Sequence, residues 1–165
     1  GLGEPLCWIA FGPFATAAAL MVISPKSGLD TIPWGTALMV GAGPAMATTL
    51  VLFCSHFHQI NQDALVGKKS PLVVLGTNRA ANFLPWLVCL IFLLELLPVL
   101  NGLWPKTAIF CLISLPSGIN LIKLTKKYHN KPNLIKNSKF SALRFQTING
   151  LSLSIGFATS YFLYR

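Results

Sequence analysis

The stretch "NFLPWLVCLIFLLELLPVL", residues 82–100, decides the fold class, because its 19 residues include only one charged side chain, Glu95. An α-helix needs about 20 consecutive, mainly apolar residues to cross the hydrocarbon core of a bilayer. The whole chain has the same character, since 53% of its 165 residues are hydrophobic and 10% are charged. Soluble domains carry roughly 25% charged residues. We therefore predict an all-α, polytopic membrane helical bundle.

Four further apolar stretches have a similar length and composition. With residues 82–100, the predicted spans cover residues 5–23, 33–55, 106–121 and 145–164, which makes five transmembrane helices in one domain over residues 1–165. Pro116 and Ser117 interrupt the fourth span. The similar segments around Gly12-Pro13 and Gly43-Pro44 indicate kinked helices that approach one another closely.

The basic residues alternate with these spans. Ten of them lie in the predicted loops 56–81 and 122–144, whereas the opposite connections and the C-terminus hold three, Lys26, Lys106 and Arg165. Positive residues favour the cytoplasmic side of a membrane, so we expect both loops and the N-terminus on the cytoplasmic or stromal side. The net charge of +9 is distributed over short loops between apolar spans, so we expect no nucleic-acid partner.

The main polar stretch is "CSHFHQINQDALVGKKSP", residues 54–71. If the second span continues as a helix, His56, Gln59 and Asp63 share one face, because they are spaced by three and seven residues. His58 lies on another side of that helix, so the His-x-His pair does not suit one transition metal. None of the four cysteines forms a Cys-x-x-Cys pair, so no zinc site is indicated.

The oxygen atoms in this stretch suit a hard cation better. Mg²⁺ is commonly held by one or two carboxylates together with substrate phosphates. Asp63 offers a carboxylate, and Gln59 and Asn61 offer weaker oxygen ligands. Gly67 is expected to end the helix, and Lys68 and Lys69 follow it, where their ammonium groups can meet phosphate oxygens. A solvated loop whose charges only fix the membrane topology is an equally open interpretation of the spacing.

Three segments resemble aromatic prenyltransferases of the UbiA superfamily. They are "GLGEPL" (residues 1–6), "LFCSHFHQINQDALVGKKSPLVVLGT" (residues 52–77) and "ALRFQTINGL" (residues 142–151). The chain is most similar to the 1,4-dihydroxy-2-naphthoate phytyltransferases of cyanobacteria and plastids. The resemblance covers the C-terminal half of such enzymes, which implies the second half of a fold of roughly nine helices.

The resemblance also implies roles for single residues. Members of the superfamily hold Mg²⁺ against a prenyl diphosphate with two Asp-rich motifs, the second of which is usually Asp-x-x-x-Asp followed by Gly-Lys. Asp63, Gly67 and Lys68 match this second motif, and Gln59 replaces its first Asp, which removes one anionic ligand. The resemblance implies catalytic roles for Asp63 and Lys68, Mg²⁺ binding by Asp63 and Gln59, and substrate binding by Lys69, Gln59, His56, His58, Asn61 and Glu4.

The implied reaction is the transfer of a phytyl group, or another prenyl group, from its diphosphate to 1,4-dihydroxy-2-naphthoate with loss of CO₂, in phylloquinone or menaquinone biosynthesis. Aromatic rings facing the cavity stabilise a carbocation, and Trp8, Phe53 and Phe57 are the candidates. The implied location is a cyanobacterial cell or thylakoid membrane, or a plastid membrane, with membrane lipid as a further partner.

Two features complicate this interpretation. The chain lacks an initiator Met and the first Asp-rich motif, so we expect a fragment that is inactive without the missing N-terminal half. A membrane assembly or lipid-interaction subunit and a small transporter stay open as alternatives. A transporter needs ionisable residues along a path, and Glu95 is the available one, for which we prefer a carboxyl group that faces the interior of the bundle.

Overall fold

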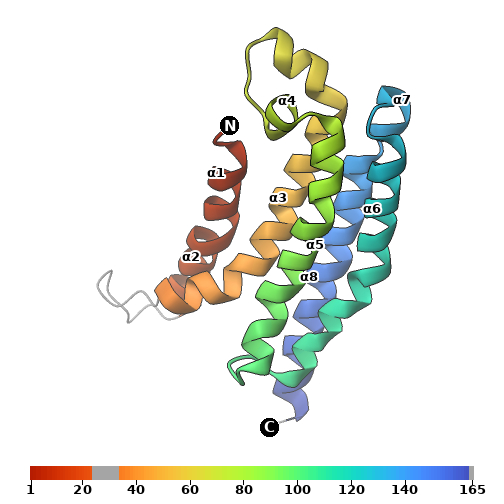
Figure 1. Ribbon diagram of the computed structural model, residues 1–165. Helices are drawn as coiled ribbons and strands as arrows, with labels where there is room; N and C mark the ends of the chain where they lie inside the picture. Colours follow the sequence, from red (N-terminus) through yellow and green to blue (C-terminus); the bar gives the residue numbers. More distant parts are fainter. Residues whose placement is uncertain (24–33, 164–165) are drawn as a thin grey trace.

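The computed structural model describes residues 1–23 and 34–163, and within these ranges the chain forms helices and no strands (Figure 1). The prediction of an all-α fold is confirmed. Lys26, Asp30 and Arg165, together with the ends of two predicted spans at residues 33 and 164, lie outside the described residues. The helices are α1 (Gly3–Ile9), η1 (Ala10–Phe14), α2 (Ala15–Ile23), α3 (Trp34–Leu65), α4 (Pro71–Leu75), α5 (Thr77–Leu100), η3 (Lys106–Ser114), α6 (Leu115–Tyr128), α7 (Pro132–Ile135) and α8 (Ser138–Leu163).

Four helical segments in the described part are long and apolar enough to cross a membrane: Gly3–Ile23, Trp34–Leu65, Thr77–Leu100 and Lys106–Tyr128. These segments overlap the first four predicted spans, and together with the all-helical fold they confirm a membrane helical bundle. Helix α8 contains the fifth predicted span and is 26 residues long. Its polar residues, among them Gln146 and Asn149, lower its apolar character, so the fifth crossing stays a prediction.

The helices extend beyond the apolar spans into the predicted loops, as the helical interpretation of residues 56–63 requires. Helix α3 continues to Leu65 because residues 56–65 include no Gly or Pro, so the first half of the predicted loop 56–81 is helical. The loop 122–144 contains the end of α6, all of α7 and the start of α8. Pro116 does not break the fourth span, because it lies in the first turn of α6, where a missing N–H group is tolerated.

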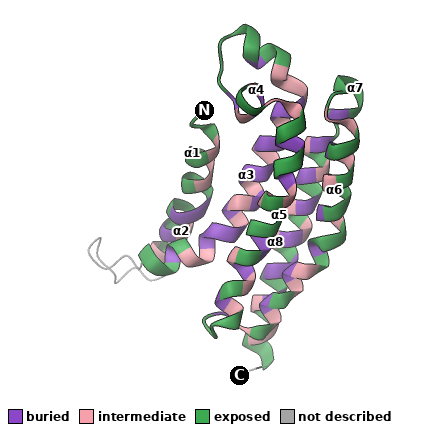
Figure 2. Cartoon of the chain, viewed as in Figure 1, coloured by how far each residue is buried: buried purple, intermediate pink, exposed green. Residues whose placement is uncertain are grey.

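Helix α3 packs against most of the other long helices and carries many of the buried side chains (Figure 2). Near its start, α3 crosses η1, a π-helical turn that contains Pro13. A Cβ atom on Gly41 would lie 2.7 Å from the carbonyl carbon of Gly12, so the two backbones meet directly. The predicted close approach of small residues is therefore found at this crossing.

The N-terminus, α4 and α7 lie at the same end of the bundle (Figure 1). A hydrogen bond of 3.1 Å between the Thr77 hydroxyl and Nδ1 of His129 joins the start of α5 to the residue after α6. The two basic connections thus lie at one end, as the charge pattern predicts. The side of the membrane that this end faces stays a prediction.

Candidate active site

Asp63 is held near the C-terminus of α3 by the way that helix ends. Gly67 has φ of +70°, a left-handed conformation that a residue without Cβ adopts at little cost. The N–H of Lys68 donates to the carbonyl of Asp63 (2.8 Å), and the N–H of Gly67 donates to the carbonyl of Ala64 (3.1 Å). This pair of bonds is a Schellman motif, and it turns the chain back so that Lys68 returns to the side of Asp63.

Lys68 and His56 both contact the Asp63 carboxylate. The Nζ atom of Lys68 lies 3.2 Å from Oδ1 of Asp63, and Nδ1 of His56 lies 2.9 Å from Oδ2. Asp63 is 7% exposed, whereas about half of the Lys68 side chain is exposed. The predicted face shared by His56 and Asp63 is confirmed, and the site combines a buried carboxylate with a cation open to its surroundings.

His56 connects this pair to the first helix. Its second ring nitrogen, Nε2, lies 3.1 Å from Oε1 of Glu4 in α1. An imidazole that faces a carboxylate at each ring nitrogen donates to both only when it is protonated. Oε1 of Glu4 is buried and has no aligned hydrogen bond within the described residues, so it retains capacity for a further donor.

Ser70 was not predicted as a site residue. It is buried, its hydroxyl lies close enough to Asp63 to stabilise the carboxylate, and its Oγ makes no fully aligned hydrogen bond with the described residues. It occupies the N-cap position of α4, directly before Pro71. A Ser-Pro pair is a helix-start signal, so the sequence did contain a sign of this position.

The other predicted substrate-binding residues lie around Asp63 without pairing with it. Gln59 is partly exposed one turn before Asp63, Asn61 is exposed on another side of α3, and Lys69 is exposed after the turn. His58 is partly buried, and its Nδ1 is buried without a hydrogen-bond partner among the described residues. The structure thus brings together Glu4, His56, Asp63 and Lys68 out of the predicted set.

An apolar cavity of about 430 Å³ begins at Glu4. Trp8 lines it and donates a hydrogen bond of 3.1 Å from its indole nitrogen to the carbonyl of Ala42. Phe53 and Phe57, the other aromatic candidates, are buried against each other in the core instead. The remaining lining residues come from α1, α3 and α5: Pro5, Met46, Thr49, Leu90 and Leu94.

The residues around Asp63 fit part of a Mg²⁺ site. Within the described ranges, no three His, Cys, Asp or Glu side chains are arranged to hold a metal ion. Both oxygens of Asp63 already accept a contact, but a carboxylate has about four lone-pair sites and can accept more. Mg²⁺ commonly needs only one or two carboxylates, with substrate phosphates completing its shell, so Asp63 with Gln59 offers one protein-bound portion of such a shell.

Comparisons with known proteins agree with the predicted resemblance. The chain is 37% identical over 158 residues to a chloroplastic 2-carboxy-1,4-naphthoquinone phytyltransferase of Arabidopsis thaliana, with 94% of this chain and 41% of the relative covered. It is 35% identical over 157 residues to a 2-carboxy-1,4-naphthoquinone phytyltransferase of Synechocystis, with 95% of this chain and 49% of the relative covered. No family model and no solved structure matches.

The chain spans somewhat less than half the length of these two relatives. The match covers 94% and 95% of this chain, so it includes the segment that carries Asp63 and Lys68. The chain is therefore similar, along almost all of its residues, to part of the 2-carboxy-1,4-naphthoquinone phytyltransferases, and the resemblance predicted from the sequence is confirmed.

Proposed function

We propose that this chain forms part of a membrane prenyltransferase that transfers a phytyl group from its diphosphate to 1,4-dihydroxy-2-naphthoate. The proposal depends on one observation above all: the buried Asp63 carboxylate, which pairs with the half-exposed Lys68, is linked through His56 to Glu4, and Glu4 lines an apolar cavity. A prenyl diphosphate likewise has a charged part and an apolar part, because it consists of an anionic diphosphate head and a long apolar chain.

The diphosphate head binds at the cationic side of the site. The half-exposed Lys68 ammonium donates to diphosphate oxygens while Asp63 holds it in place. Lys69 follows in the same turn and adds a second cation. Positive charge next to the diphosphate stabilises the negative charge that develops as the allylic C–O bond breaks, and preorganised groups of this kind are often the largest contribution to catalysis.

The same residues provide a place for Mg²⁺. Asp63 and Gln59 would hold the ion together with diphosphate oxygens, and the bound ion supplies further positive charge to the leaving group. His56 and Glu4 act differently, because the imidazole keeps the Asp63 carboxylate oriented from one side and Glu4 fixes the imidazole from the other. This chain of contacts links the diphosphate site to α1.

The apolar cavity holds the first part of the isoprenoid chain. Each CH₂ group removed from water contributes roughly 0.8 kcal/mol. The apolar side chains exclude water, which would otherwise capture the allylic cation. Trp8 lines this cavity, and the π face of an indole ring favours positive charge near it.

The aromatic acceptor captures the cation through a ring carbon. The two relatives are named for 2-carboxy-1,4-naphthoquinone, which is the two-electron oxidised form of 1,4-dihydroxy-2-naphthoate. We favour the dihydroxy form as acceptor, because its ring is rich in electrons. A C–C bond forms to the ring, diphosphate leaves with the electron pair of the C–O bond, and the carboxyl group leaves as CO₂.

Activity requires a second segment, which we propose corresponds to the N-terminal part of the relatives that this chain does not span. That segment would carry a further Asp-rich motif and complete the metal site. We place the reaction at the cytoplasmic or stromal face of a cyanobacterial or plastid membrane, with the product entering phylloquinone or menaquinone biosynthesis.

The test is an assay in membranes from a host that makes no naphthoquinones. The chain is expressed alone or together with the N-terminal segment of the Synechocystis relative, and the membranes receive phytyl diphosphate, 1,4-dihydroxy-2-naphthoate and MgCl₂. We expect prenylated product only when both segments are present. Asp63→Asn should lower the rate at least ~100-fold, as the loss of a preorganised charged group does.

Lys131→Gln serves as the matched control, because Lys131 is an exposed cation in the other basic connection and should leave the rate unchanged. An Asp63→Asn variant with full activity would overturn the proposal, as would a wild-type pair that binds both substrates and forms no product. Product formed by the chain alone would overturn the requirement for a second segment.

A further inference from the structure

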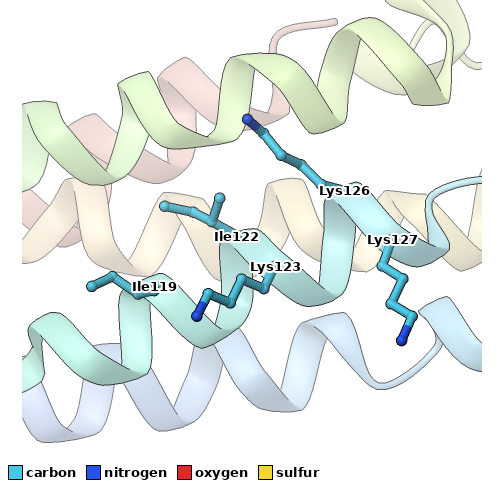
Figure 3. Close-up of a pocket in the computed structure, with 5 residues that line it drawn as sticks. All are labelled: Ile119, Ile122, Lys123, Lys126 and Lys127. Carbon is cyan, nitrogen blue, oxygen red and sulfur yellow. The ribbon is translucent and has the colours of Figure 1, made fainter.

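One face of α6 changes from apolar to cationic along its length. Ile119 and Ile122 come first, and Lys123, Lys126 and Lys127 follow (Figure 3). These five residues, the lysine face, line a shallow hollow of about 640 Å³ on the outside of the bundle. They lie along one broad face of the helix, because steps of three or four residues connect residues 119, 122 and 126 and residues 119, 123 and 127. Ile119 and the three lysines are exposed.

The charges of the lysine face are not neutralised within the described part of the chain. The three carboxylates of that part are committed elsewhere, since Glu4 and Asp63 pair with His56 and Lys68, and Glu95 is buried. The Nζ atom of Lys127 lies 5.3 Å from the centre of the Tyr128 ring, which attracts the cation without removing its charge. Three cations thus remain available to an external anion.

The usual causes of helix-end lysines explain only part of this arrangement. Lys126 and Lys127 lie in the last turn of α6, where the helix dipole favours cations. Lys123 lies a turn earlier, and neither the dipole nor the topology rule explains the exposed Ile119 and the partly buried Ile122 beside the cations. Ile119 and Lys127 are eight residues apart, or about 12 Å along the helix axis, so one amphiphile can contact both parts.

We propose that the lysine face is a binding site for an anionic phospholipid, with the phosphate head on the lysines and the start of an acyl chain along Ile119 and Ile122. The face lies on Lys106–Tyr128, a segment that is long and apolar enough to cross a membrane. On such a segment the isoleucines can contact the acyl chain of a lipid and the lysines its head group. The charge is complementary to an anionic head, and each lysine near the surface contributes about fivefold to the attraction of such lipids. None of the five residues lines the cavity at Glu4, so the site is separate from the proposed prenyl transfer.

The test uses the full chain, purified in a neutral detergent, with dioleoylphosphatidylglycerol as the anionic probe and dioleoylphosphatidylcholine as the zwitterionic one. Native mass spectrometry measures the lipids that stay bound, and thermal unfolding measures the shift in Tm. We expect phosphatidylglycerol to bind and to raise Tm, and phosphatidylcholine to do neither. Lys123→Gln combined with Lys126→Gln should weaken phosphatidylglycerol binding about 25-fold, from about fivefold per lysine.

The matched control is the double variant Lys131→Gln with Lys136→Gln, which removes the same charge from exposed positions outside the lysine face and should weaken binding less than fivefold. Ile119→Ser should weaken binding of the long-chain lipid and leave that of dihexanoylphosphatidylglycerol unchanged. If the double variant does not fold, each single lysine variant provides the same comparison at about fivefold.

Three results would overturn the proposal. Equal weakening by the two double variants would mean that only diffuse positive charge attracts the lipid. Equal binding of the two dioleoyl lipids would exclude recognition of an anionic head. Displacement of the lipid by an equimolar prenyl diphosphate, with the Lys123/Lys126 double variant losing both ligands, would identify the face as part of a donor site instead.

Discussion

Asn149 of α8 donates a hydrogen bond of 2.9 Å from Nδ2 to Oε2 of Glu95 of α5, and both side chains are fully buried. The same Nδ2 lies 3.3 Å from the hydroxyl of Ser114 at the end of η3. The preferred interpretation of Glu95, a carboxyl group that faces the interior of the bundle, is therefore confirmed. Three helical segments meet at this contact, so we expect it to contribute to the stability of the bundle.

Replacing Glu95 should reveal that contribution. Glu95→Leu removes the acceptor and leaves the Asn149 amide buried without it, which costs about 1–3 kcal/mol. Glu95→Gln keeps an oxygen acceptor and should cost less than about 1 kcal/mol, since interhelical hydrogen bonds in membranes average ~0.6 kcal/mol. Thermal unfolding in detergent measures both variants. A Glu95→Leu variant as stable as the wild type would contradict the expectation.

Gly43 should be coupled to Glu95. A Cβ atom on Gly43 would lie 2.5 Å from Cγ of Glu95, so Gly43→Ala forces the two helices apart and should cost about 1–3 kcal/mol, as overpacking does. In a Glu95→Ala background the Cγ atom is gone and the same change should be nearly neutral. Gly150→Ala in α8 is the control, because nothing lies within 4 Å of its added Cβ. Equal costs of Gly43→Ala in both backgrounds would disprove the coupling.

The turn at Gly67 should affect both stability and substrate binding. Gly67→Ala places a Cβ atom at φ of +70°, which costs roughly 1–2 kcal/mol. It also disturbs the return of Lys68 to Asp63, so binding of the prenyl diphosphate should weaken more than the fold does. Gly67→Asn should be milder, because Asn tolerates left-handed conformations. Diphosphate binding measured by calorimetry, compared with the loss in Tm, checks this, and unchanged binding in Gly67→Ala would speak against it.

Filling the cavity at Glu4 should change the preference for the prenyl chain. Leu94→Trp places a larger side chain in the cavity of about 430 Å³ and leaves less room for the substrate. KM for phytyl diphosphate should therefore rise about tenfold or more, the equivalent of ~1.4 kcal/mol. A shorter prenyl diphosphate should be less affected. The assay is the two-segment prenyl transfer described above. Leu143→Trp makes the same change in a separate, larger hollow between α1, α3 and α8. Equal effects of the two variants on KM would remove the cavity at Glu4 from the proposal.

Local patterns predicted much of the fold and part of the site. Apolar stretches located four helices because lipid tolerates few charges in a span, and helical periodicity placed His56 and Asp63 on one face. The contact between Lys68 and Asp63 was harder to predict from the sequence. Gly67 was recognised as a helix end, but the hydrogen bonds that fold Lys68 back depend on the left-handed conformation that Gly67 adopts.

Contacts between distant segments could not be read from the sequence alone. Glu4 and His56 are brought together by the packing of α1 on α3, and the resemblance of residues 1–6 gave the only hint of it. Asn149 lies in a segment that resembles the phytyltransferases, but no local pattern pairs it with Glu95. Both pairings depend on how the helices pack, and small residues contribute to that packing: the backbones of η1 and α3 meet at Gly12 and Gly41, and Gly43 lies against the Glu95 side chain.

Helix α3 has 32 residues and is therefore about 48 Å long, whereas the hydrocarbon core of a bilayer is about 30 Å thick. Its first turns cross η1, Pro44 lies inside it, and its final turns hold Asp63, so a single bent helix connects the crossing with η1 to the candidate site (Figure 1). We expect the position of Asp63 relative to the membrane to be set by the helical rise of the residues between Pro44 and Asp63. A thinner or thicker bilayer would shift this carboxylate relative to the lipid surface without changing its distance to His56.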